Sequence, residues 1–172
     1  PVIANPDQVD SDGDGVGDAC DTPIARCAYV SAGADASCQA NPSIDNGSYD
    51  PDGDAITLEQ TPPGPYSLGS TSVTLTVTDA DGTWDSCTDT VTVSDTTAPS
   101  LSCPASPVSA ECTAPGGAPV TFSATAQDNC STVTPLCTPA SGSTFPIGST
   151  LDTCSGTDAS GNTSTCTFNV QV

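Results

Sequence analysis

The sequence predicts an all-β protein of two tandem antiparallel β-sandwiches that follow a short, extended N-terminal segment. Val73, Leu75 and Val77 alternate with threonines, which is the period-two pattern of a half-buried strand. No window shows sustained helical periodicity, and 16 Pro and 15 Gly punctuate the chain at short intervals. A duplicated segment indicates two copies of one module. The expected parts are residues 1–23, 24–94 and 95–172.

The N-terminal part contains a dense acidic loop that starts at Asp10. Counted from there, carboxylates occupy positions 1, 3, 5, 9 and 12, and Gly15 occupies position 6. This is the ligand spacing of a twelve-residue calcium loop, in which position 7 contributes a main-chain carbonyl. Position 12 is Asp rather than Glu, a shorter side chain for bidentate closure. The expected calcium ligands are Asp10, Asp12, Asp14, Val16, Asp18 and Asp21.

With its lead-in, Asn5-Pro6-Asp7-Gln8-Val9, this loop resembles a thrombospondin type 3 repeat. The resemblance implies an extracellular element with almost no hydrophobic core of its own. It also implies that calcium is structural there and that the five aspartates of the loop are the ligands.

Composition limits the classes of function that this chain can have. Ten Cys with no His and no Met favour a disulfide framework in an oxidising, extracellular or cell-surface setting, and the cysteines lack the paired spacing of a zinc site. A formal charge of −20 excludes nucleic acid as a partner. The sequence contains no run of 18 apolar residues, so it does not predict membrane insertion. Because the chain starts at Pro1 and lacks Met, we expect a processed product or an excerpt.

The duplication has a constant offset. Gly69 and Cys87 of the first copy correspond to Gly148 and Cys166 of the second, and 148 − 69 and 166 − 87 both equal 79. Thr78-Asp79-Ala80-Asp81-Gly82 likewise matches Thr157-Asp158-Ala159-Ser160-Gly161. In each copy we expect a strand before this acidic turn and a return strand after it, with Val91 and Val93 on the first return strand.

The second copy resembles a hyalin repeat (HYR) domain. The residues that carry the resemblance are Asp95-Thr96-Thr97-Ala98-Pro99, Cys103-Pro104, Asp128-Asn129, Phe145-Pro146-Ile147-Gly148 and Asp158-Ala159-Ser160-Gly161-Asn162 before Cys166-Thr167-Phe168. The resemblance implies an immunoglobulin-like (Ig-like) extracellular module with a role in adhesion or spacing. The first copy resembles a divergent HYR or PKD-like domain, because it lacks the Phe-Pro pair. These resemblances imply that both sandwiches are Ig-like.

The HYR resemblance implies a disulfide between the first and last strands, Cys103–Cys166, and the offset extends this pairing to Cys27–Cys87. For the remaining cysteines of the second copy we favour Cys112–Cys130 and Cys137–Cys154, with Cys154–Cys166 across a hairpin as a rival. Cys20–Cys38 follows by elimination. Cys20 or Cys38 is an equal candidate for a bond to another chain.

Two further acidic groups are candidate calcium sites. The first consists of Asp45, Asp50, Asp52 and Asp54, for which the alternative is a polar turn that needs no metal. The second consists of Asp79, Asp81 and Asp85, for which the alternative is ordinary turn chemistry. In the second copy the equivalent cluster thins to Asp158, so no metal is expected there.

Several other residues are candidates for function. Trp84 is a possible ligand surface, although a lone Trp in a small sandwich is more often part of the core. Asn46, Asn129 and Asn162 lie in glycosylation sequons. Val2, Ile3 and Ala4 can form a strand that adds to a neighbouring sheet edge. With no His or Lys, nucleophilic triads cannot be assembled, and we expect no catalysis.

The sequence therefore predicts a calcium-stabilised extracellular structural or adhesion module, from a surface stalk or a repeating fibre. Its expected partners are calcium ions and copies of itself, or other extracellular proteins and glycans. Two alternatives stay open: a ligand- or carbohydrate-binding adhesin module, and accessory domains of a larger secreted enzyme.

Overall fold

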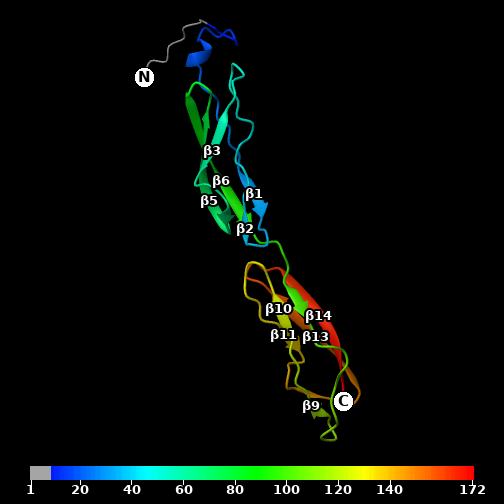
Figure 1. Ribbon diagram of the computed structural model, residues 1–172. Coiled ribbons are helices and arrows are strands. Elements are labelled where there is room, and N and C mark those ends of the chain that lie inside the picture. Colours follow the sequence, from blue (N-terminus) through cyan, green and yellow to red (C-terminus); the bar gives the residue numbers. More distant parts are fainter. Residues whose placement is uncertain (1–8) are drawn as a thin grey trace. The chain divides into compact units, whose positions relative to one another are not determined.

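The computed structural model describes residues 9–172, and the predicted assembly strand Val2, Ile3 and Ala4 lies outside them. The described chain is all-β apart from η1, a three-residue 3-10 helix at Asp18–Cys20. It divides into two compact units, Pro1–Ser94 and Asp95–Val172 (Figure 1). The predicted fold class, all-β with two sandwich-like halves, is confirmed. Among these residues, no helix is both long and apolar enough to cross a membrane.

The first unit is built around one four-stranded sheet and a small two-stranded sheet. The large sheet has the order β1-β6-β5-β3, and β2 pairs with β4. Hairpin strands β5 and β6 pair along ten positions, from Gly69↔Val93 to Thr78↔Trp84. The strand bounds are β1 Val30–Gly33, β2 Gln39–Ala40, β3 Thr57–Thr61, β4 Tyr66–Ser67, β5 Gly69–Thr78 and β6 Trp84–Ser94.

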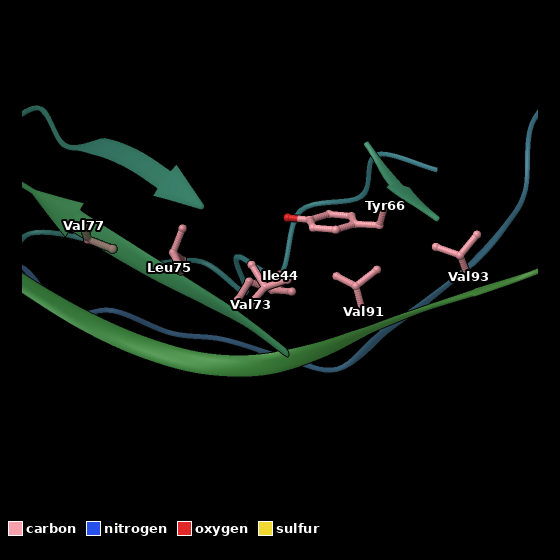
Figure 2. Close-up of a cluster of buried hydrophobic side chains, with 7 residues drawn as sticks. All are labelled: Ile44, Tyr66, Val73, Leu75, Val77, Val91 and Val93. Atoms are coloured by element: carbon pink, nitrogen blue, oxygen red, sulfur yellow. The ribbon is translucent and has the colours of Figure 1, made fainter. Parts of the chain in front are cut away.

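The core of the first unit follows from the alternation in β5 and β6. Alternate side chains in the central part of these strands are buried, and Figure 2 shows them in one cluster with Ile44 and Tyr66. The phenol of Tyr66 donates to the carbonyl of Pro62 at 3.0 Å and accepts from the side-chain amide of Gln60 at 2.9 Å, so that its polar end is satisfied. The buried cluster comprises Ile44, Tyr66, Val73, Leu75, Val77, Val91 and Val93.

The second unit repeats this plan. Its main sheet has the order β11-β13-β14-β8, and the pairs β10–β7 and β12–β9 form two small sheets. Phe122 packs edge-on against Phe145 and Phe168, with ring centroids 6.2 and 4.8 Å apart, and these rings fill the core. The strands are β7 Ser100–Ser102, β8 Val108–Ser109, β9 Ala118–Pro119, β10 Thr125–Gln127, β11 Leu136–Thr138, β12 Thr144–Phe145, β13 Ser149–Thr157 and β14 Thr163–Gln171.

Each main sheet also contains one parallel pair, which the antiparallel prediction did not include. β1 runs parallel to β6 in the first unit, and β8 runs parallel to β14 in the second. In both cases an early strand of the unit lies beside its last strand. Short polar strands carry no alternation strong enough to reveal this pairing in the sequence.

Three of the disulfides join an early or neighbouring segment of a unit to the main hairpin of that unit. They are Cys27–Cys87, Cys103–Cys166 and Cys137–Cys154. The first two correspond at their second cysteine, since 166 − 87 equals the offset of 79, while their first cysteines differ by 103 − 27, which is 76. All three are among the pairs favoured from the sequence. The rival pair Cys154–Cys166 does not form, although these residues face each other across β13 and β14.

Two predicted disulfides are wrong. Cys112 is a free, exposed thiol whose Sγ donates to the carbonyl of Ala114 at 2.9 Å, whereas Cys130 is disulfide-bonded, so Cys112–Cys130 does not exist. Cys38 is disulfide-bonded but the exposed Cys20 is not its partner, so Cys20–Cys38 is also wrong. Both pairs were assigned without knowledge of the loop paths, which decide where exposed thiols lie.

Candidate metal centre

The acidic loop is organised by its own aspartates. Both carboxylate oxygens of Asp10 accept from main-chain N–H groups, those of Gly13 at 2.8 Å and Gly15 at 3.2 Å. Asp12 and Asp14 each accept from the N–H group two residues further on, at 3.0 and 2.7 Å. Gly15 has a φ of 96°, a left-handed conformation that the sharp turn requires and that glycine adopts without strain. One oxygen of each of the three aspartates lies within 4.8 Å of the others.

Asp18 closes the loop. Its two carboxylate oxygens accept from the N–H and the hydroxyl of Ser11, both at 2.8 Å, and its own N–H donates to the carbonyl of Val9 at 2.9 Å. Burial acts to raise the pKa of Asp18, but the hydrogen bonds from Ser11 hold it below its ordinary value. Val16, the predicted carbonyl ligand, lies between these segments with an exposed side chain.

Three carboxylates from two separate parts of the first unit meet beside this loop. One oxygen each from Asp12, Asp21 and Asp52 lie within 4.8 Å of one another. Asp12 and Asp21 belong to the loop, whereas Asp52 comes from the turn that precedes β3. Both oxygens of Asp52 and Oδ2 of Asp21 are buried without a hydrogen-bond partner among the described residues. Asp52 therefore joins the N-terminal loop rather than a separate site of its own.

The carboxylates of this group repel one another, and a bound cation would relieve that repulsion. Burial, then the close approach of the Asp21 carboxyl and then the charges of neighbouring carboxylates raise the pKa of Asp52 to about 6, and burial also raises the pKa of Asp21. The only basic side chain of the sequence, Arg26, lies elsewhere, 4.6 Å above the ring of Tyr49. A set of carboxylate oxygens with no nitrogen or sulfur ligand fits a hard divalent cation such as calcium.

Neighbouring residues shape this site without joining it. Asp50 is buried, and its Oδ1 accepts from the N–H groups of Asp52 and Asp54 at 3.0 and 3.2 Å, which fixes the turn that carries Asp52. Burial and nearby acids raise the pKa of Asp54. Asp45 caps a different turn, where it accepts from the N–H of Ser48 at 2.9 Å. The predicted group of four aspartates is therefore split, and only Asp52 reaches the loop.

The turn of the β5–β6 hairpin contacts the main chain of Asp21 beside the site. Oδ1 of Asp79 accepts from the N–H groups of Gly82 and Thr83 at 2.7 and 2.8 Å. The hydroxyl of Thr83 lies against Oδ2 of Asp79 and the carbonyl of Asp21, 2.7 Å away. Asp85 accepts from the N–H of Ala25 at 2.9 Å. Together with the exposed Asp81, these aspartates belong to no three-carboxylate group within residues 9–172.

The remaining candidates lie apart from the acidic site. Trp84 is 63% exposed at the start of β6, so it is not a core residue. Asn46 is exposed, whereas Asn129 and Asn162 are half-buried. The side-chain amide of Asn162 donates to Asp158 at 2.8 Å and to the carbonyl of Asp95 at 3.2 Å, which leaves it poorly placed for glycosylation.

Comparison with known proteins finds one family model that matches the second unit. Residues 94–172 match the model of the HYR domain, which confirms the hyalin-repeat resemblance of the second copy. HYR domains are extracellular, adhesion-type modules and are in general not enzymes. No curated protein sequence matches the chain.

Solved structures that are similar to the chain include extracellular cadherin domains of three protocadherins. They are domains 1–4 of protocadherin gamma B7 (TM-score 0.39, 9% identity), the extracellular domain of gamma B4 (0.37, 14%) and domains 1–5 of gamma B2 (0.39, 11%). The alignments cover 88%, 87% and 87% of this chain and 50%, 32% and 38% of those structures. The chain thus spans half or less of their length.

Proposed function

We propose that this chain is an extracellular structural or adhesion module whose first unit is stabilised by calcium. The observation that carries the proposal is the meeting of Asp12, Asp21 and Asp52, where three carboxylate oxygens are buried without a partner. Calcium bound there links the N-terminal loop to the turn before β3. It thereby gives a loop that has no core of its own a fixed attachment to the sandwich.

Other features support the extracellular setting. The structure contains disulfides in both units, which persist in oxidising compartments. The HYR match adds an adhesion-type module. Extracellular calcium is abundant enough to occupy sites of modest affinity, with dissociation constants of about 10⁻⁴–10⁻³ M. Assembly into a fibre through Val2, Ile3 and Ala4 stays a prediction, and light scattering with and without a chelator tests it.

The proposal is tested by calcium titration of the full chain and of two variants. Asp52→Asn removes one charge and both unpartnered anionic oxygens, while its N–H can still donate to Asp50. Glu59→Gln is the matched control, because Glu59 is an exposed residue of β3 outside every carboxylate group in the described chain. The readouts are calorimetric binding, the thermal midpoint, and hydrogen exchange of residues 9–21.

We expect calcium to raise the thermal midpoint and slow exchange of residues 9–21 in the wild type and in Glu59→Gln, but not in Asp52→Asn. A ligand at 100 times its dissociation constant stabilises the folded state by about 2.7 kcal/mol. In chelator the order reverses: Asp52→Asn melts above the wild type, because one repelling carboxylate is gone. Equal calcium responses in all three proteins, or none in any, would refute the proposal.

A further inference from the structure

The second unit contains its own group of converging carboxylates. One oxygen each from Asp95, Asp128 and Asp158 lie within 4.8 Å of one another. These are three of only five acidic residues between positions 95 and 172, the others being Glu111 and Asp152, and the same stretch has no Lys, Arg or His. No side chain of this unit can therefore neutralise the group.

Main-chain hydrogen bonds hold all three side chains in place. Oδ1 of Asp95 accepts from the N–H of Thr97 at 3.0 Å, and Oδ1 of Asp128 accepts from the N–H groups of Cys130 and Ser131, both at 2.9 Å. Oδ1 of Asp158, in the β13–β14 hairpin, accepts from two N–H groups of its own turn at 2.9 and 2.8 Å. One oxygen of each carboxylate, Oδ1, therefore accepts all the main-chain hydrogen bonds that hold these turns.

The second oxygen atoms of two of these carboxylates have no interaction partner in the described part of the chain. Oδ2 of Asp95 and Oδ2 of Asp128 are buried and lack a hydrogen-bond partner in the described chain. Asp95 is only 7% exposed, so its carboxylate lacks the solvation that water gives an exposed acid. Oδ2 of Asp158 accepts a single hydrogen bond, from the amide of Asn162 at 2.8 Å. Three aspartates from separate segments are therefore preorganised with no protein cation.

We propose that Asp95, Asp128 and Asp158 bind a calcium ion in the second unit, at a place where the sequence predicted no metal. Only carboxylate oxygens are offered, which selects a hard cation. Asp128 also lines an open hollow of about 300 Å³ together with Thr97 and Gln127. With three side-chain ligands, the expected dissociation constant is about 10⁻⁴–10⁻³ M, the range of extracellular modules.

The site is tested by two-dimensional ¹H–¹⁵N NMR of the ¹⁵N-labelled full chain during titration with calcium chloride. The reporters are four of the main-chain amides that donate to the three carboxylates, those of Thr97, Cys130, Ser131 and Ser160. Asp128→Asn removes one charge while its Oδ1 can still accept from the turn. Glu111→Gln is the control, because Glu111 is exposed and lies outside the group. Asp52→Asn removes the first site independently.

In the wild type, Glu111→Gln and Asp52→Asn, we expect the four reporter amides to shift along one saturation curve. In Asp128→Asn, affinity at this site should fall about tenfold or more, while amides of residues 10–21 keep their response. In chelator, Asp128→Asn should melt at or above the wild-type temperature, which a purely structural aspartate would not allow. If Asp128→Asn does not fold, Asp95→Asn, which keeps the Thr97 contact, takes its place.

Three results would overturn the second site. The first is the absence of reporter shifts up to about 10⁻² M calcium, ten times the weakest expected constant. The second is an unchanged response in Asp128→Asn. The third is loss of the reporter shifts in Asp52→Asn, which would assign them to the first site. Because residues 10–21 report separately, failure of the second site leaves the test of the first one intact.

Discussion

The hydroxyl of Thr83 donates to the main-chain carbonyl of Asp21 at 2.7 Å, although the two residues are 62 positions apart. The second unit has the same tie with a different side chain. There the amide of Asn162 donates to the carbonyl of Asp95 at 3.2 Å, and 162 − 83 equals the duplication offset of 79. In each unit, the residue at the end of the acidic hairpin turn thus donates a side-chain hydrogen bond to the segment that precedes the first strand.

Loss of the hydrogen bond from Thr83 to the carbonyl of Asp21 should weaken the attachment of the N-terminal loop to the β5–β6 hairpin. Thr83→Val keeps the shape of this buried side chain but removes its hydrogen bonds to Asp21 and Asp79. We expect a loss of about 1–3 kcal/mol in the free energy of unfolding, because a charged acceptor and a carbonyl lose their donor. Hydrogen exchange of residues 18–21 should also accelerate.

Thr74→Val is the matched control for this prediction. The Thr74 hydroxyl pairs only with that of Thr88, at 3.0 Å on an exposed face, so the change should alter stability by about 0.5 kcal/mol or less. Equal effects of the two substitutions, or unchanged exchange in Thr83→Val, would contradict the role of Thr83 as a tie.

Much of the fold could be predicted because the duplication fixes equivalent positions. The pairing Thr78↔Trp84 of the first hairpin recurs as Thr157↔Thr163 in the second, each shifted by 79. Alternation in β5 predicted its buried valines correctly, because a period of two puts side chains on opposite faces. Cys112 and Cys130 could not be placed in the same way, because their loops carry no repeating pattern.

The candidate site was predictable only in part, for a physical reason. A twelve-residue calcium loop is a local pattern, so Asp12 and Asp21 could be found from spacing alone. Asp52 lies 31 residues beyond Asp21, and only folding brings it to the loop. The sequence does not predict the group of Asp95, Asp128 and Asp158, because these three residues are far apart in sequence and only folding brings them together. The Asp-Asn segment after β10 and the Asp-x-Ser-Gly-Asn segment of the β13–β14 hairpin are the sequence features that mark Asp128 and Asp158.

The stabilisation that a disulfide contributes should grow with the logarithm of the length of the loop that it closes. Cys27–Cys87 spans 60 residues and Cys137–Cys154 spans 17. Loop-closure entropy then gives contributions of about 4 and about 3 kcal/mol. Replacement of each pair by alanine, followed by urea denaturation, should show the larger loss for Cys27–Cys87. A larger loss for the shorter loop would show that local packing, rather than chain entropy, dominates.

Gly117 should not tolerate a side chain. It has a φ of 121°, and a Cβ atom there would lie 1.8 Å from the carbonyl oxygen of Phe145, a main-chain atom of β12. Gly117→Ala should therefore destabilise the protein by about 1–3 kcal/mol or more. Gly116→Ala is the control, since a Cβ atom there meets nothing within 4 Å and φ lies outside the left-handed range. Equal melting temperatures for the two variants would contradict this reasoning.

Asp152 occupies the place in the second core that Val73 occupies in the first. The two positions differ by 79, and both side chains are fully buried. Neither carboxylate oxygen of Asp152 has a hydrogen-bond partner in the described chain. Burial raises the pKa of Asp152 above 3.8, and the nearby N–H groups of Thr153 and Thr138 offset only part of this rise.

The sign of the pH dependence follows from this raised pKa. Below the unfolded-state value near 3.8, Asp152 is protonated in both states, and its full contribution to stability is present. As pH rises through the folded-state pKa, the folded protein must bury a charge or retain a proton that the unfolded chain releases. Stability contributed by this group is therefore lost toward neutral pH.

Asp152→Asn, which cannot ionise, should remove this dependence. At pH 7 we expect the variant to be more stable than the wild type by about 1–2 kcal/mol, and at pH 3 the two should be nearly equal. Urea denaturation at several pH values measures the difference, and Glu111→Gln controls for the loss of one charge from the same unit. A constant difference across pH, or a destabilised variant at pH 7, would contradict a raised pKa of Asp152 in the folded protein.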